Sequence, residues 1–207
     1  MKTTLDTKYT VAIFGVGSLG ANTALTISRR FGQDVGFYII DCGVIEDKNR
    51  KNQPWFDVNV GQKKVSVLAS SLWHQSNARS KVFSKKVSSM FDVKNLNIKD
   101  RLDLIIDCFD NPASRRLTND YAKELKIDIL HSGFYESGFK CDWNSKFTIR
   151  KGSDQSREPI CDRRDLACIV QIGAALTAES CYQYFINKKK SGYFFDLTGG
   201  KIFFTNL

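Results

Sequence analysis

Short apolar runs alternate with segments of helical periodicity over the first 135 residues. Runs that are apolar on both faces are typical of buried parallel strands. Such runs cover residues 11–14, 37–40, 104–106 and 127–130, with a further candidate at 81–87. Between them, apolar positions three and four residues apart predict helices over 18–31, 62–74 and 113–125. This alternation predicts an α/β fold, a doubly wound Rossmann-like sheet that is mostly parallel.

The pattern changes after Gly133. Residues 139–151 alternate as an antiparallel strand does, and 165–187 read as a long apolar helix. Two aromatic runs, at 193–195 and 202–204, predict a terminal hairpin around Thr198–Gly200. Residues 152–164 are polar and lack periodicity, which indicates a long loop. We therefore expect one domain over 1–207, with antiparallel strands added in its C-terminal third.

Composition and charge exclude several classes of protein. A content of 42% hydrophobic and 12% aromatic residues excludes a disordered or collagenous chain. The sequence has no apolar run near the ~18 residues of a membrane span and no hydrophobic signal core at its start, so we expect a soluble, cytoplasmic protein without a membrane partner. Six cysteines are too sparse for a disulfide scaffold. The net charge of +9 is scattered, so nucleic-acid binding is disfavoured as the main function.

A glycine motif lies between the first predicted strand and helix. Gly15, Gly17 and Gly20 form G-x-G-x-x-G, and Ser18 opens the helix. Such glycines allow a tight turn and close approach to phosphates, while the helix N-terminus supplies N–H groups. Asp41 ends the next strand, where a carboxylate meets ribose hydroxyls. Alone, the motif indicates an adenine nucleotide and leaves NAD open.

A second polar set favours ATP. It comprises the stretch from Asp41 to Gln53, the segment Gly61–Lys64, and the segment from Asp107 through Arg115 to Asn119. Hydride transfer does not require these groups. Adenylate formation does, because it needs cations on the triphosphate, a carboxylate for Mg²⁺ and polar groups that align the attacking carboxylate.

These segments match, in order and spacing, the ThiF/MoeB/HesA family, the bacterial relatives of ubiquitin-activating enzymes. The chain resembles this family over residues 8–187. The resemblance implies that ATP and Mg²⁺ activate the C-terminal carboxylate of a ubiquitin-like or sulfur-carrier protein ending in Gly-Gly. Residues 1–135 would then be the nucleotide-binding half, and residues 136–207 the half for carrier binding and dimerisation.

The resemblance also implies residue roles. Gly15, Gly17, Ser18 and Gly20 would cradle the nucleotide, and Asp41 would bind the ribose. Asn49, Gln53 and Lys64 would approach the phosphates. Asp110 would hold Mg²⁺ or orient the α-phosphate, with Arg115 lining the same pocket. Lys64 and Asp110 are thus candidate catalytic residues.

Four features depart from the family pattern. Asn52 stands where an arginine usually precedes the glutamine, and Gly43 stands where an acidic residue is common. The first strand begins near residue 9, without the N-terminal helix whose arginine serves the neighbouring subunit in dimeric relatives. Paired CxxC zinc motifs are absent from the sequence. These departures fit a minimal enzyme, or a catalytically reduced subunit that scaffolds a partner in a homodimer or heterodimer.

Other functions remain open from sequence. They are a nicotinamide-dependent oxidoreductase, and adenylation of a small peptide or of RNA, which relatives also perform.

Some cysteines and histidines are candidates for a catalytic or ligand-contacting role, and others are expected to pack in the core. Cys161 lies in the polar loop with three arginines nearby, which favour a thiolate, so it is a candidate acyl or persulfide carrier. Cys168 is expected to pack in the core, with Cys42 and Cys108 as small buried side chains. His131 ends a central strand at the ligand edge of the sheet. Neither His131 nor the other histidine, His74, has the spacing of a metal ligand.

Overall fold

The structure, a computed structural model, describes residues 5–98, 101–135, 138–149, 166–197 and 199–205. Its strands are β1 (Tyr9–Phe14), β2 (Val35–Ile40), β3 (Arg79–Phe83), β4 (Leu104–Asp107), β5 (Ile129–Tyr135), β6 (Gly138–Trp143), β7 (Gly192–Asp196) and β8 (Lys201–Thr205). Its α-helices are α1 (Ser18–Phe31), α2 (Lys64–Ser76), α3 (Met90–Lys94), α4 (Pro112–Leu125) and α5 (Ala167–Asn187).

All eight strands form one sheet in the order β3-β2-β1-β4-β5-β6-β7-β8. Strands β1 to β5 are parallel, while β6, β7 and β8 are added antiparallel. The strand order reverses between β1 and β4, where Phe14 is in register with Asp107. A reversal of this kind opens a crevice at the carboxyl ends of the two strands, which is where open α/β sheets bind ligands.

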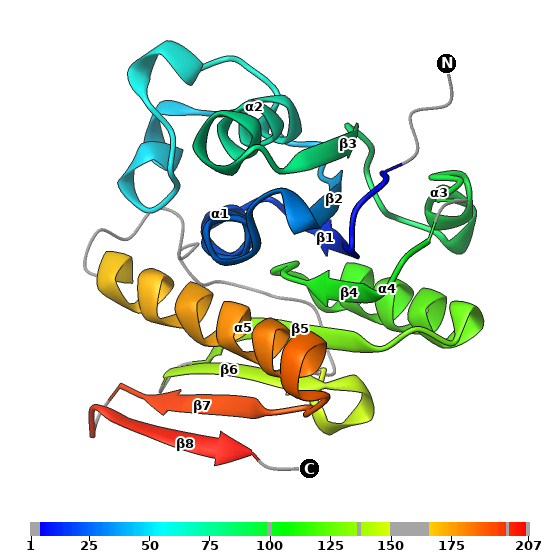
Figure 1. Cartoon of the computed structure of the whole chain (residues 1–207). Coiled ribbons are helices and arrows are strands. Elements are labelled where there is room, and N and C mark those ends of the chain that lie inside the picture. The colour runs from blue at the N-terminus through cyan, green and yellow to red at the C-terminus, as the bar shows by residue number, and fades with distance from the viewer. Residues whose placement is uncertain (1–4, 99–100, 136–137, 150–165, 198, 206–207) are drawn as a thin grey trace.

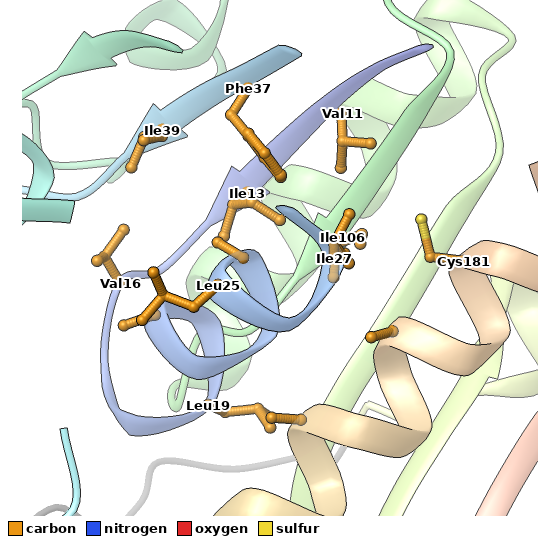
Figure 2. Packing of buried hydrophobic residues seen from close by; sticks show 14 of the residues in the cluster. Val11, Ile13, Val16, Leu19, Leu25, Ile27, Phe37, Ile39, Ile106 and Cys181 are labelled. Atoms are coloured by element: carbon orange, nitrogen blue, oxygen red, sulfur yellow. The ribbon is translucent and has the colours of Figure 1, made fainter. Parts of the chain in front are cut away.

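Helices cover both faces of the sheet. Alternate residues of β1 and β2 point to opposite sides, so Ile13 and Phe37 join one core cluster and Phe14 and Tyr38 the other. The first cluster packs beneath α1, α2 and α5, and the second beneath α3 and α4. Helices α1 and α5 pack directly against each other (Figure 1). Figure 2 shows side chains of β1, β2, β4 and α1 converging on the first cluster, with Cys181 reaching it from α5.

The predicted architecture is confirmed, with corrections to element lengths. The strand expected over 139–151 stops at Trp143, because Asn144 takes a left-handed φ of 48° and its Oδ1 accepts the Ile129 N–H at 3.0 Å. Strand β5 runs further than expected, to Tyr135, because it pairs with β6 as well as β4. Helix α3 was not predicted; it begins at Met90, and its N-cap is Ser89, whose Oγ accepts the Asp92 N–H.

Four further sequence predictions differ from the structure or concern residues outside its described range. The strand expected over 81–87 runs instead from Arg79 to Phe83. Cys42 is exposed and Cys108 is only partly buried, so neither is the fully buried side chain expected. The loop expected over 152–164 and Thr198 of the hairpin turn lie outside the described residues. None of the described helices combines the length and apolar character needed to cross a membrane.

A polar junction around Asp128 connects the start of β5 to the end of α5. The Asp128 carboxylate accepts hydrogen bonds from Lys190 Nζ at 2.6 Å, Asn144 Nδ2 at 3.0 Å and Tyr184 Oη at 3.1 Å. Burial raises the pKa of Asp128, but the three hydrogen bonds outweigh it and hold the pKa below its usual value. The carboxylate is therefore stabilised by folding in its ionised form.

Replacing this carboxylate should destabilise the fold in a pH-dependent way. We expect Asp128→Ala to lower the free energy of unfolding by about 1–2 kcal/mol at pH 7, because charge-assisted hydrogen bonds to a partly exposed group are lost. A depressed folded-state pKa contributes stability above the unfolded value, about 3.9, that disappears as pH falls through the folded value. Urea unfolding at pH 7 and pH 3 measures the difference, with exposed Asp120→Ala as control. An equal loss at both pH values would contradict this account.

Candidate functional site

The glycine motif forms the turn from β1 into α1, and the structure shows a different use for glycine at each of its three positions. Gly15 has a φ of +89°, which side chains rarely adopt. A Cβ on Gly20 would lie 1.9 Å from the Gly15 carbonyl oxygen, so the first turn of α1 rests directly on the loop backbone. A Cβ on Gly17 would meet nothing within 4 Å. The backbone at Gly17 therefore borders open space that a phosphate can enter.

The N-terminus of α1 provides positive potential at this turn. The helix is 14 residues long, its first turn has no acidic residue, and no side chain caps it at Gly17. Arg29 and Arg30 lie in the last turn, where cations complement the dipole. The first N–H groups of a helix have no partner within it. The glycine turn is thus suited to bind an anion.

Asp41 follows β2 and holds the glycine turn in place. Its Oδ2 accepts the Val16 N–H at 2.6 Å, and its Oδ1 accepts the Gly43 N–H at 2.5 Å. A carboxylate can accept about four hydrogen bonds, so two remain for hydroxyl donors. The position predicted to bind ribose therefore also shapes the phosphate turn.

Lys64 lies beside Asp41 because residue 43 is glycine. Lys64 is the first residue of α2, and its N–H donates to the Gly43 carbonyl at 3.1 Å. A Cβ on Gly43 would lie 2.9 Å from Asp41 Oδ1 and 3.3 Å from Lys64 Cδ and Cε. The glycine that departs from the family pattern thus leaves room for the lysine stem beside the backbone of residue 43.

The segment between Asp41 and Lys64 buries Asn49 and Gln53, which are each 4% exposed. The Asn49 Oδ1 accepts the Glu46 N–H at 3.0 Å and so caps the 3₁₀ turn Asp47–Lys51. The Gln53 Oε1 accepts the Trp55 Nε1–H at 2.7 Å, while Gln53 Nε2 is buried and has no partner among the described residues. A buried donor left unpaired costs about 1–3 kcal/mol, so Gln53 is suited to a ligand acceptor.

Asp110 is exposed at the carboxyl end of β4, directly before α4. The Cys108 N–H donates to the Phe14 carbonyl at 2.8 Å, which joins this end of β4 to the end of β1. A Cβ on Gly15 would lie 3.0 Å from the Cys108 carbonyl carbon. The loop that contains Asp110 therefore shares the crevice with the glycine turn.

A buried ionic network lies directly behind Asp110. Asp107 is fully buried; its Oδ2 accepts from Arg115 Nη1 at 2.9 Å and contacts His131 Nδ1 at 2.7 Å. Arg115 Nη2 also donates to the Ser132 carbonyl at 2.7 Å. Asp107 Oδ1 accepts the Phe109 N–H at 3.1 Å, so the network fixes the backbone that leads to Asp110.

This network contains two residues, His131 and Arg115, that the sequence placed near the ligand. His131 is fully buried and stacks on Phe147 at 5.2 Å, so it does not reach the ligand edge as an accessible side chain. Arg115 is 8% exposed and its described hydrogen bonds go to the network; its place in a nucleotide pocket stays a prediction. In the sequence, the only sign of this network is Asp107, a carboxylate that directly follows the apolar run 104–106.

The residues present fit ATP and Mg²⁺. The open space at Gly17, the helix N-terminus and Lys64 suit a triphosphate. Mg²⁺ is commonly held by one or two carboxylates together with substrate phosphates and waters, so Asp110 alone suffices on the protein side. Among the residues that the structure describes, no group of three or more His, Cys, Asp or Glu side chains could hold a metal ion by itself.

Of the two candidate cysteines, Cys168 belongs to the described residues and Cys161 does not. Cys161 lies within residues 150–165, outside the described chain. Cys168, expected in the core, is exposed in the first turn of α5. The expectation was wrong because the apolar face of α5 begins at Val170, and residue 168 falls on another side of the helix.

Cys168 borders a cleft that sequence did not reveal. The cleft has a volume of about 290 Å³ and lies between α1, the segment 51–54 and α5. Its lining comprises Asn22, Lys51, Asn52, Gln53, Pro54, Ala167, Cys168 and Gln171. The Asn22 side chain joins the three walls: its Nδ2 donates to the Ser18 carbonyl at 2.7 Å and the Asn52 carbonyl at 3.2 Å, and its Oδ1 accepts from Gln171 Nε2 at 3.1 Å.

Solved structures share this fold at low sequence identity. E. coli MccB crystallised with ATP has a TM-score of 0.72 and 19% identity, over 96% of this chain and 63% of that one. E. coli MccB with AMPCPP and MccA has a TM-score of 0.75 and 17% identity, over 98% and 64%. PaaA has a TM-score of 0.71 and 17% identity, over 96% and 64%. The chain thus spans under two thirds of the length of these proteins.

Sequence comparison identifies the family. None of the curated proteins compared with the chain matches it significantly. The model of the ThiF family matches residues 5–197, a range that includes the glycine turn, Asp41, Lys64, Asp110 and the residues that line the cleft. The chain therefore belongs to the ThiF family.

Proposed function

We propose that the protein uses ATP to adenylate the C-terminal carboxylate of a protein or peptide. The observation that supports this most directly is the crevice at the β1–β4 reversal, where the glycine turn lies against Cys108 and Phe109 of the loop that leads to Asp110. The fold is shared with E. coli MccB, which has been crystallised with ATP and with MccA. Within the family, a ubiquitin-like or sulfur-carrier protein ending in Gly-Gly is the substrate that we propose for this chain.

The proposed reaction displaces pyrophosphate from ATP. A carboxylate oxygen bonds to the α-phosphorus while the bond from that phosphorus to the bridging oxygen breaks. The α1 N-terminus and Lys64 neutralise phosphate charge, and Asp41 orients the ribose. Asp110 would hold Mg²⁺, which supplies further positive charge on the phosphates. The buried Asp107 network fixes the backbone that leads to Asp110 before the substrate binds.

A catalytically reduced subunit is the second candidate, and one observation favours it. Asn52, at the family's usual arginine position, is 6% exposed, and its carbonyl accepts from Asn22. A neutral residue there removes one cation from the phosphate site. Pyrophosphate exchange by the chain alone separates an enzyme from a scaffold. A nicotinamide oxidoreductase has less support, because it does not require Lys64 and Asp110.

The C-terminal hairpin is the surface that we propose for assembly. Strand β8 is the open edge of the sheet, and Ile202, Phe203 and Phe204 on it are 48%, 48% and 66% exposed. Alternate residues of a strand point to opposite faces, so both faces of this edge are apolar. Exposed apolar edge strands readily pair with another chain. We propose a homodimer or a heterodimer with a related chain through this edge.

Removing the Asp110 carboxylate should abolish adenylation without unfolding the protein. We expect Asp110→Ala to reduce ATP–pyrophosphate exchange with the cognate carrier by about 10²–10³-fold, or 2.7–4 kcal/mol of barrier, as for other single electrostatic contacts. The side chain is exposed, so thermal stability should stay near that of the original protein. Asp120→Ala, an exposed aspartate further along α4, is the matched control. Near-normal exchange by Asp110→Ala would refute the assignment.

Breaking the apolar edge should dissociate the assembly. We expect Phe204→Lys to convert a dimer into a monomer, since the substitution places a charge on the open edge strand. Because Phe204 is 66% exposed in the single chain, the variant should remain folded as a monomer. Light scattering coupled to gel filtration measures the mass. A stable monomer of the original chain at high micromolar concentration would refute the proposed dimer.

Two cysteine variants test whether the acyl group moves to sulfur. With enzyme, ATP, Mg²⁺ and the carrier, a thioester appears on a non-reducing gel as an adduct that dithiothreitol removes. We propose Cys161 as the acceptor, so Cys161→Ala should lose the adduct and retain pyrophosphate exchange. An adduct that persists in this variant and disappears in Cys168→Ala assigns the role to Cys168. No adduct with any cysteine limits the protein to adenylation.

A further inference from the structure

One edge of the sheet carries a run of cations that the proposed reaction does not use. Strand β3 stands first in the sheet order, so its outer side has no neighbouring strand in the described part of the chain (Figure 1). Between Asp57 and Asp92 the sequence contains no aspartate or glutamate, although the whole chain contains 22. We define the basic edge as the four cationic side chains on β3 and just after it, Arg79, Lys81, Lys85 and Lys86.

The charges of the basic edge are not neutralised by the described residues. Lys81 is partly exposed and the other three side chains are exposed. No described carboxylate forms an ion pair with any of the four, whereas Arg30 and Arg50 on other surfaces each pair with one. A surface with one sign of charge attracts a partner of the opposite sign and repels a like one.

The basic edge is held in a fixed place by buried neighbours. The Phe83 ring packs against the Tyr38 ring, with 6.2 Å between their centroids. Val87 is 4% exposed, and its carbonyl accepts a side-chain hydrogen bond from α4 at 3.0 Å. Lys85 and Lys86 are therefore presented by a short segment that is anchored on both sides.

The backbone of β3 offers unused donors and acceptors beside these cations. The Phe83 carbonyl accepts the Asp41 N–H at 3.2 Å, and Phe83 is in register with the last residue of β2, so its backbone groups point toward β2. Successive residues of a strand direct their backbone groups to opposite sides. The N–H and C=O groups of Ser80 and Val82 therefore point to the open side of the sheet.

Charge decides which kind of chain can pair with this edge. Arg79 and Lys81 are two residues apart, so they lie on one face of β3 about 7 Å from each other. Cations on an edge strand oppose pairing with a second copy of the same edge. The opposite edge, β8, has one cation in Lys201 and three exposed apolar side chains, so only β3 is protected in this way. Carboxylates at alternate positions of an extended segment would match the spacing of the β3 cations.

We propose that β3 binds an acidic, extended segment of another polypeptide, which adds to the sheet as a further strand. Main-chain hydrogen bonds to Ser80 and Val82 give the segment its register, and the basic edge selects carboxylates. A nucleic acid fits this edge less well, because it has no main chain of alternating donors and acceptors for Ser80 and Val82. The partner surface is separate from the proposed adenylation, and neither depends on the other.

Designed peptides test the proposal without ATP or turnover. The probe is a peptide of alternating Glu-Val repeats, acetylated and amidated at its ends, titrated into the isotope-labelled full chain and followed by NMR. A peptide of Lys-Val repeats reverses the charge. A peptide of Glu-Pro repeats keeps the charge but lacks most of the N–H groups that strand pairing needs. Oligothymidylate represents a nucleic acid.

Binding should depend on both charge and main-chain pairing. The Glu-Val peptide should shift the amide resonances of Ser80 and Val82 and slow their hydrogen exchange, with little change on β8. The Lys-Val peptide should not bind, and the Glu-Pro peptide should bind about tenfold more weakly or worse, because main-chain hydrogen bonds are lost. Added salt should weaken the Glu-Val complex, because exposed charges are screened.

Charge reversal on β3 should weaken the complex. Arg79→Glu/Lys81→Glu should raise the Kd of the Glu-Val peptide by about tenfold or more, because two attractions become repulsions. Lys201→Glu, an exposed cation on the opposite edge strand, is the matched control and should leave the Kd unchanged. If the β3 variant does not fold, Lys85→Glu/Lys86→Glu in the exposed segment after the strand tests the same charges and should also raise the Kd.

The proposal is overturned if the Glu-Val peptide does not bind at about millimolar concentration, if either control peptide binds equally well, or if the affinity survives both double variants. Tighter binding of oligothymidylate that both double variants abolish would assign the edge to a nucleic acid instead. A loss of mass in light scattering by Arg79→Glu/Lys81→Glu would assign it to a second copy of the chain. None of these measurements bears on Asp110 and pyrophosphate exchange.

Discussion

The contact between the Gly20 α-carbon and the Gly15 carbonyl is the constraint on which the site depends. The space there is too small for a Cβ, which would lie 1.9 Å from the carbonyl oxygen. The contact brings the first turn of α1 onto the end of β1, beside the Cys108–Asp110 loop of β4. Helix α1 then forms the layer against which α5 packs (Figure 1). A side chain at residue 20 would separate the helix from the turn and so alter the phosphate cradle and the cleft together.

The fold was largely predictable from sequence, because its signals are local. Ile13 and Phe14 face opposite cores, so an apolar run without alternation correctly identified a strand covered on both sides. The length of β6 was not predictable, because it depends on the bond from the Ile129 N–H to Asn144, 15 residues away. Helix α3 has only five residues, and its start depends on the Ser89 cap rather than on an apolar stripe.

The site also has a part that the sequence predicts and a part that it does not. Gly15, Asp41, Lys64 and Asp110 stand at or near strand and helix ends, so their sequence motifs predict that they share one crevice, and their roles there stay a prediction. The Asp107–Arg115–His131 network joins β4, α4 and β5, and only the register of the sheet shows that the three side chains meet. His131 is not at the end of a strand as expected, because β5 continues past it to Tyr135 and His131 is fully buried within the sheet against Phe147.

Burial explains why one part of the crevice has charged side chains and the other part has neutral amides. Lys64 and Asp110 are at least partly exposed, so water solvates their charges when no ligand is bound. Asn22, Asn52 and Gln53 are between 4% and 7% exposed, where an unpaired charge would be far more costly than an amide. An arginine at residue 52, as in most of the family, would need a permanent counter-ion in this buried place. Amides avoid that requirement, because they carry no charge.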